Sequence, residues 1–144
     1  MKAIHNSSKS ELVFREPDKQ PDNDAKPYGL WYGVDDAWAD WCRSEMPDWL
    51  KPNNFIIEID YAKMIRITTE SDLLLFTEEY GVENPWPRKT YISWPTVAKE
   101  YSGIEISPYR WDCRLNVPWY YGWDCASGCI WKSDAIKSIE KEGD

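Results

Sequence analysis

The chain has 144 residues, a length that suits one domain with a core of ordinary size, so we expect residues 1–144 to fold as a single unit. Its formal net charge of −8 disfavours a general nucleic-acid-binding or anionic-membrane-binding protein, because both need a basic patch. An acidic inhibitor that binds a basic partner is compatible with this charge, although the charges are mixed along the chain rather than gathered in one block.

Tryptophan and tyrosine dominate the aromatic residues. Ten tryptophans and nine tyrosines stand beside three phenylalanines, so the excess is of rings that carry a polar atom. Such rings build cores, but they also build stacking sites and interfaces. Because so many indoles cannot all be fully buried in a domain of this size, we expect an exposed aromatic cleft or partner surface.

The sequence predicts a cytoplasmic protein without a membrane span. No apolar run approaches the length of a span, and residues 1–10 lack the apolar centre of a signal peptide. The four cysteines are then expected to be thiols. Cys125, Cys129 and the only histidine, His5, have a poor spacing for zinc, so we expect no metal. Cys125 or Cys129 as a nucleophile paired with His5 is an alternative that no local motif favours.

Apolar alternation and turn residues predict the elements of the first half of the chain. In order, we expect a strand over 2–8, a solvated loop over 16–26, a strand over 28–32, a helix over 35–46, a strand over 54–60, and a turn with a short strand over 61–67. Asp35 or Asp36 is expected to cap the helix, and Pro47 to end it.

The second half predicts further strands and short helices. In order, we expect a helix capped by Thr69 and ended by Gly81, a loop over 82–90, a helix from Ser93 ended by Gly103, a strand over 104–109, an irregular segment over 111–123, a strand over 124–131 and a last helix capped by Ser133. This order indicates an α+β fold with mixed or antiparallel β-sheets and short peripheral helices.

The stretch KPYGLWYGVDDAWADWC, residues 26–42, combines a strand that ends in a glycine with the start of a helix. Such a junction places backbone N–H groups and aromatic faces at one rim, where small ligands are often held. A core strand and helix with unusually large side chains is the alternative interpretation.

Several short motifs fall in an order that resembles the ADP-ribosyltransferase superfamily. They are IHNSS in the first strand, GLWYG in the second, and WPTVAKEYSGIEI before the last predicted strand. The chain also resembles small phage and bacterial proteins that contain KPxGLW and SGCIW. The resemblance implies an ADP-ribosyltransferase-like fold that transfers ADP-ribose from NAD, used as a substrate, to a macromolecular acceptor. That acceptor would be a host protein or nucleic acid in a bacterial or phage-infected cell.

The resemblance also implies a set of site residues. In that family a first-strand histidine contacts the ribose of NAD, and here it corresponds to His5. The second strand supplies a small residue and rings around the nicotinamide, which correspond to Gly29, Trp31 and Tyr32. Tyr28 or Trp41 is a further wall residue on this comparison.

The late segment DCASGCIW departs from the family, which places a glutamate there against the nicotinamide ribose. Asp124 is the nearest carboxylate and is one methylene shorter, so it is the expected catalytic residue beside His5. Asp112 and Glu105 are alternatives, and Asp124 as an ordinary turn residue stays open. Ser127 can offer its hydroxyl to the same ligand, or it can be a turn serine before Gly128.

Three functions from different classes follow from these residues. The first is an enzyme that transfers ADP-ribose. The second is a nucleotide-binding module that uses the aromatic cleft without catalysis. The third is an acidic protein-binding inhibitor whose tryptophans anchor the interface.

Overall fold

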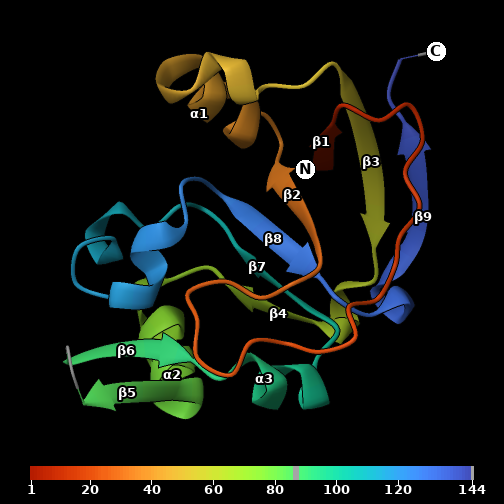
Figure 1. Cartoon of the computed structure of the whole chain (residues 1–144). Coiled ribbons are helices and arrows are strands. Elements are labelled where there is room, and N and C mark those ends of the chain that lie inside the picture. Colours follow the sequence, from red (N-terminus) through yellow and green to blue (C-terminus); the bar gives the residue numbers. More distant parts are fainter. Residues whose placement is uncertain (86–87, 144) are drawn as a thin grey trace.

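The computed structural model describes residues 1–85 and 88–143, and within them seven strands form one mixed β-sheet with three short α-helices at its periphery (Figure 1). In sheet order the strands are β4 (Met64–Ile67), β7 (Gly103–Ile106), β8 (Ser127–Ile130), β2 (Leu30–Val34), β1 (Ala3–Ser7), β3 (Asn53–Ile59) and β9 (Ile136–Lys141). The helices are α1 (Ala37–Glu45), α2 (Glu70–Tyr80) and α3 (Trp94–Glu100), and β5 (Gly81–Pro85) pairs with β6 (Arg88–Ile92) as a separate hairpin.

This arrangement confirms the predicted α+β class, with one domain and a mixed sheet. β4 and β7 run parallel, and the other neighbours in the sheet run antiparallel. In residues 1–85 and 88–143, no helix combines the length and the apolar character that crossing a bilayer requires.

The sheet divides into two halves between β1 and β2. β1 pairs with β2 through Ala3↔Val34 and Ile4↔Gly33, whereas it pairs with β3 along its whole length. β2 continues beside β8, from Gly33↔Ser127 to Leu30↔Ile130. Beyond Ile4 the two central strands therefore follow different neighbours and diverge, as the steep course of β3 and β9 beside the flatter course of β7 and β8 shows (Figure 1).

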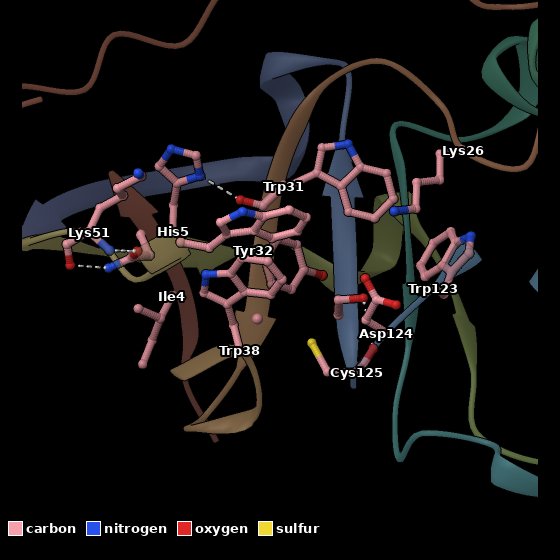
Figure 2. Close-up of a pocket in the computed structure, with 14 residues that line it drawn as sticks. Ile4, His5, Lys26, Trp31, Tyr32, Trp38, Lys51, Trp123, Asp124 and Cys125 are labelled. Carbon is pink, nitrogen blue, oxygen red and sulfur yellow. Dashed lines mark hydrogen bonds between the residues drawn. The ribbon is translucent and has the colours of Figure 1, made fainter. Parts of the chain in front are cut away.

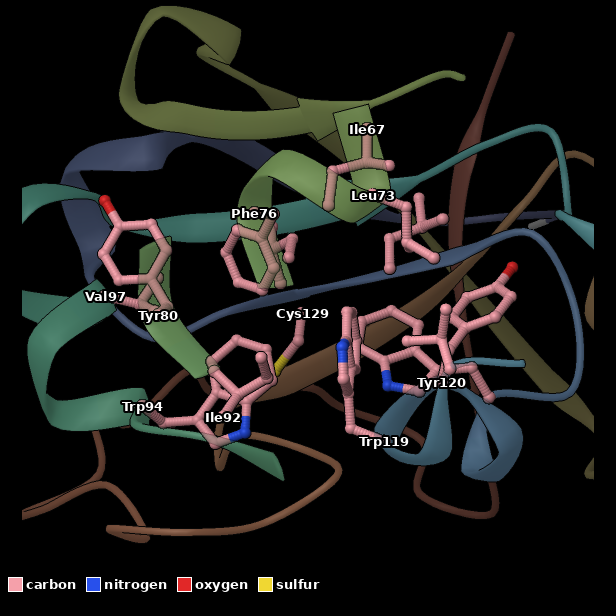
Figure 3. Close-up of a cluster of buried hydrophobic side chains, with 14 of the residues drawn as sticks. Ile67, Leu73, Phe76, Tyr80, Ile92, Trp94, Val97, Trp119, Tyr120 and Cys129 are labelled. Atoms are coloured by element: carbon pink, nitrogen blue, oxygen red, sulfur yellow. The ribbon is translucent and has the colours of Figure 1, made fainter. Parts of the chain in front are cut away.

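The larger hydrophobic core is built around buried tryptophans (Figure 3). Trp94 and Trp119 meet edge to face with ring centroids 6.2 Å apart, and both contact Phe76 of α2. The indole Nε1 of Trp119 donates to Thr77 Oγ1 at 2.9 Å, which satisfies the only polar group of that buried ring. A buried indole with a partner for its N–H costs little, and it fills the core with a large apolar area.

Two buried indoles also fasten the connection that leads into β2. Trp94 Nε1 donates to the carbonyl of Asp24, and Trp123 Nε1 donates to the carbonyl of Ala25, both at 3.0 Å. Asp24 also exchanges backbone hydrogen bonds with Ile92 of β6. The backbone is therefore fixed at the two residues that directly precede Lys26.

The start of α2 agrees with its sequence signal. The Thr69 side chain accepts a hydrogen bond from the Asp72 N–H at 3.1 Å, and Asp72 Oδ2 accepts one from the Thr69 N–H at 3.3 Å. This reciprocal pair is a capping box, so the predicted Thr69 cap is confirmed.

The predicted helix after Ser133 is wrong. Ser133–Ala135 forms one 3₁₀ turn, and Ile136–Lys141 is strand β9. Ile136 and Ile139 are three residues apart, which is a helical spacing. In β9 the register with β3 shifts between Glu58 and Ile59, and this irregularity lets both isoleucines pack against a second hydrophobic cluster that includes Ile57 and Ile59. Pairing with β3 overrides the local pattern.

Three other local expectations are corrected. Residues 82–90, expected as a loop, contribute to the β5–β6 hairpin, where Pro85 stands at a strand end and interrupts no central ladder; Pro87 lies outside the described residues. Helix α3 ends at Glu100, and Gly103 begins β7. Within the described part of the chain, Asp36 makes no side-chain capping bond to α1, and Asp35 Oδ1 instead accepts from the Lys2 N–H at 2.7 Å.

The packing of β2 against β8 depends on a glycine. A Cβ at Gly128 would lie 2.3 Å from Cζ of Tyr32 and 2.7 Å from the Ile104 carbonyl oxygen. We expect Gly128→Ala to lower the free energy of unfolding by about 1–3 kcal/mol, because a ring and a backbone atom must both shift. Urea unfolding measures this change.

Gly122→Ala is the matched control, since its Cβ would lie an ordinary 3.7 Å from Ala25 Cβ and Lys26 Cε. We expect that variant to change the unfolding free energy by less than about 0.5 kcal/mol. Equal effects of the two substitutions would contradict the close approach at Gly128.

Candidate functional site

A cavity of about 490 Å³ opens where β1 and β2 diverge (Figure 2). This volume lies in the range of pockets that hold nucleotide-sized ligands. The lining consists of Ile4, His5, Asn6, Lys26, Trp31, Tyr32, Gly33, Trp38, Trp49, Lys51, Trp123, Asp124, Cys125 and Ser127. We call this cavity the aromatic cleft.

His5 stands at the point of divergence. Its Nδ1 lies 2.6 Å from the carbonyl oxygen of Trp31, so the imidazole bridges β1 to β2 beyond the last ladder pair. A carbonyl oxygen only accepts, so Nδ1 carries the hydrogen. In the neutral ring Nε2 then has the lone pair and can accept a hydrogen bond from a ligand hydroxyl. His5 lies in β1, within the strand expected over 2–8.

Asn6 fastens the opposite rim of the cleft. Its Nδ2 donates to the Lys51 carbonyl at 2.9 Å and to Asn54 Oδ1 at 2.8 Å, while its Oδ1 accepts from the Lys51 N–H at 2.7 Å. The amide therefore fixes the backbone of Lys51 beside the cleft. Asn6, the polar residue after the histidine, therefore has a structural role in holding this rim.

Two pairs of indoles form the walls. Trp31 meets Trp123 edge to face at 5.0 Å, and Lys26 Nζ lies 5.7 Å from the centre of the Trp31 ring. On the other side Trp38 stacks with Trp49 at 6.4 Å. Figure 2 shows the Trp38 ring well apart from the Trp123 ring.

Gly33 allows the wall that Trp38 forms. A Cβ at Gly33 would lie 2.8 Å from the Cβ of Trp38. Any larger residue in that position of β2 would therefore push α1 and its indole away from the strand.

The floor beside Trp123 carries the late segment of the sequence. Asp124 and Cys125 are half-buried, and Ser127 begins β8. Ser127 Oγ donates to the Cys125 carbonyl at 2.9 Å, and the residue stands in β8 rather than in a turn. Its oxygen can still accept a hydrogen bond from a ligand. Burial raises the pKa of the Cys125 thiol to about 12, so this thiol is protonated at neutral pH and is a poor nucleophile.

Five of the residues singled out from the sequence line one cavity: His5, Trp31, Tyr32, Asp124 and Ser127. They come from β1, β2 and the approach to β8, which are far apart along the chain. Their convergence is a fact of the tertiary structure, whereas their roles toward a ligand stay predictions.

Gly29 and Trp41, also singled out, are not part of the lining among the residues that the structure describes. Gly29 passes so close to β8 that a Cβ would lie 2.4 Å from the Ile130 carbonyl oxygen, so its smallness serves chain packing. Trp41 stacks on Trp38 at 5.2 Å with an angle of 17° between the rings, so it supports the wall from behind. The Tyr28 ring is exposed.

Glu105, one alternative catalyst, is committed to a buried network. Its Oε1 accepts from the hydroxyls of Tyr32 at 3.0 Å and Tyr61 at 2.8 Å, and its Oε2 accepts from Arg66 at 3.3 Å. With 2 % exposure it has no access to a substrate. Burial, with the nearby Glu105 charge, raises the pKa of Tyr32 and of Tyr61 well above the usual value.

Asp112, the other alternative, lies outside the aromatic cleft. It pairs with Arg110 at 3.1 Å, and its carboxylate is grouped with Glu70 and the Cys113 thiol. Exposed carboxylates often gather in this way without an ion.

All four cysteines are free thiols.

The sequence did not single out the two lysines of the cleft. Lys26 opens the KPYGLW stretch, so its place beside Trp31 follows once that strand is known. Lys51 stands between Leu50 and Pro52, and no local pattern directs it toward the cleft. Its position depends on the Asn6 side chain, which is a contact across the sheet.

Comparison of the chain with protein-family models, with curated proteins and with solved structures gave no match.

The Tyr32–Glu105 hydrogen bond should contribute to stability in a pH-dependent way. Tyr32→Phe removes a bond to a buried carboxylate, so we expect it to lower the unfolding free energy by about 1–3 kcal/mol near neutral pH. The pKa of Tyr32 is raised on folding, so its contribution is full below the usual value near 10 and is lost as the pH rises above it. Urea unfolding of both proteins at increasing pH should show their difference shrinking above about pH 10.

Tyr28→Phe, at an exposed ring, serves as the control and should change the unfolding free energy little. A Tyr32→Phe difference that stays constant through the alkaline range would refute the link to the raised pKa.

Proposed function

We propose that the aromatic cleft binds NAD and that the chain transfers ADP-ribose from it to a macromolecular acceptor. One observation carries the proposal: His5, Trp31, Ser127 and Asp124 line a single cavity of about 490 Å³. These are positions to which the resemblance assigns ligand contacts, and chain proximity alone does not bring them together. We further propose that the reaction takes place in the cytoplasm of a bacterial or phage-infected cell.

The chemistry of the lining suits a dinucleotide. His5 Nε2 can accept a hydrogen bond from a ribose hydroxyl, because Nδ1 is held by the Trp31 carbonyl. The indoles of Trp31 and Trp38 offer flat faces to a base. Lys26 and Lys51 bring positive charge to the cleft of an acidic chain, and this charge suits a pyrophosphate.

Asp124 is the residue that we assign to the reaction. When NAD is bound, its nicotinamide–ribose bond can break with both electrons leaving on the neutral nicotinamide. Positive charge then develops on the ribose, and a carboxylate fixed nearby stabilises that charge. Asp124 can also take the proton that the acceptor loses when it bonds to the ribose carbon.

A non-catalytic nucleotide-binding module is the second candidate, and the length of Asp124 favours it. The side chain is one methylene shorter than the glutamate of the resembled family. Transition-state stabilisation is sensitive to displacements of about an ångström. Binding by the indoles, His5 and the lysines does not depend on this residue.

Asp124→Asn keeps the size of the side chain and removes its charge. We expect NAD affinity and stability to change little, and the rate of nicotinamide release to fall by about a hundredfold. Asp124→Glu should keep or raise the rate. Calorimetry with NAD and a nicotinamide-release assay measure the two properties, with exposed Asp18→Asn as the charge-matched control.

The outcomes separate the candidates. Full release by Asp124→Asn would remove Asp124 from the mechanism. NAD binding without release by the wild type would favour the binding module. An absence of NAD binding, even with candidate acceptors present, would favour the acidic protein-binding inhibitor.

Lys51→Met tests the assignment of the lysines, because it removes the charge and keeps most of the stem. We expect it to weaken NAD binding by about tenfold, the scale of one charge-assisted hydrogen bond, and to leave the affinity for nicotinamide riboside unchanged. Lys99→Met on the exposed surface of α3 is the control. Equal losses for NAD and for nicotinamide riboside would show that Lys51 does not recognise the pyrophosphate.

A further inference from the structure

Three indoles form a partly exposed surface at the mouth of the aromatic cleft. Trp38 and Trp41 lie one turn apart on α1 and are stacked, with ring centroids 5.2 Å apart. Trp49 follows α1 and lies 6.4 Å from Trp38 and 5.7 Å from Trp41. Trp49 is 47 % exposed, and the other two are half-buried. We call these three residues the tryptophan shelf.

The shelf is continuous with two cavities. Trp38 and Trp49 line the aromatic cleft. Trp38 also lines a second cavity of about 450 Å³, which shares Ile4 and Asn6 with the cleft. The charged residues that line the second cavity are Asp35, Asp36, Glu142, Lys2 and Arg43. A group bound on the shelf therefore adjoins the cleft on one side and, on the other, a cavity with three carboxylates and two basic side chains.

The segment that carries the shelf is rich in carboxylates, although Lys2 and Lys51 also lie beside its indoles. The segment 35–49, which carries all three indoles, holds five carboxylates and one arginine, and all six charged side chains are exposed. They are Asp35, Asp36, Asp40, Glu45, Asp48 and Arg43. Arg43 already pairs with Asp40 at 3.5 Å. Several carboxylates beside exposed indoles remain for a ligand of opposite charge.

We propose that the tryptophan shelf docks an arginine-containing basic segment of a partner protein. A guanidinium stacks on an indole face and is attracted by the ring, and the surrounding carboxylates add charge complementarity. A nucleic acid is disfavoured, because its phosphates would meet the same carboxylates. In the proposed ADP-ribosyl transfer this partner is the acceptor, and its role as acceptor rests on the proposed function. The docking of a basic segment on the shelf does not depend on that function.

Fluorescence anisotropy tests the docking with two synthetic probes. One is a short fluorescein-labelled peptide that alternates arginine with glycine and serine, and the other has citrulline at every arginine. Citrulline keeps the shape and removes the charge. We expect the full-length protein to bind the arginine peptide at low salt at least about fivefold more tightly than the citrulline peptide. This preference should shrink as salt is raised.

Matched variants locate the site. We expect Trp49→Leu to weaken binding of the arginine peptide by about fivefold, the scale of one cation–π contact. Trp111 is 70 % exposed and lies outside the shelf, so Trp111→Leu should leave the affinity unchanged. We expect the double variant Asp36→Asn and Asp48→Asn to weaken peptide binding by about threefold or more. Glu78→Gln with Glu79→Gln, the same charge change on exposed positions of α2, should have no effect.

The results divide cleanly. Equal binding of the two peptides, equal effects of the Trp49 and Trp111 variants, or tighter binding of a single-stranded oligonucleotide would overturn the docking proposal. Peptide binding by a wild type that releases no nicotinamide would leave the docking standing and remove the transferase activity. Nicotinamide release and acceptor modification without any preference for arginine would keep the transferase and remove the docking site.

Discussion

The divergence of β1 from β2 is the constraint on which the rest of the site depends. A continuous ladder would close the sheet at this point. After Ile4 the His5 imidazole takes up the Trp31 carbonyl oxygen, and β1 follows β3 instead. The backbone acceptor on β2 thus keeps a partner while the two strands separate. The same contact orients the ring and places the hydrogen on Nδ1, so the hydrogen bond that holds β2 where the strands separate also fixes Nε2 as the free ring nitrogen.

The tryptophans explain why the two rims of the cleft hold their shape. Buried indoles must find an acceptor for the N–H group, and in this core several acceptors are backbone carbonyls of connecting segments. Trp94 and Trp123 hold Asp24 and Ala25, just before Lys26. Phenylalanine would fill less of this volume and, lacking an N–H group, would make none of these bonds. The preference for tryptophan over phenylalanine in the composition therefore reflects loops that are fixed from the core, as well as rings that line the cleft.

The sequence predicts the elements whose signals are local, and it fails where pairing decides. The Thr69 capping box needs only residues that lie within a turn of one another. By contrast, the spacing of Ile136 and Ile139 matches a helix, and only the shifted register opposite Ile59 makes it a strand. The same division holds for the site. His5 and Trp31 belong to short motifs, and both line the cleft, whereas the place of Lys51 depends on hydrogen bonds with Asn6 across the sheet. Gly29 shows the reverse error, because a glycine in a motif served packing against β8.

Net charge and local charge lead to different conclusions for this chain. A net charge of −8 argues against broad anionic surfaces as partners, yet the field inside a cleft depends on the charges within a Debye length, about 8–10 Å at ordinary salt. Lys26 and Lys51 lie in the cleft, while the carboxylates of residues 35–49 surround α1 beside it. Trp38 lies between the two regions and lines both the cleft and the second cavity. Lysines that face the cleft and carboxylates beside α1 therefore adjoin each other across a single indole, a local arrangement that the net charge of the chain does not reveal.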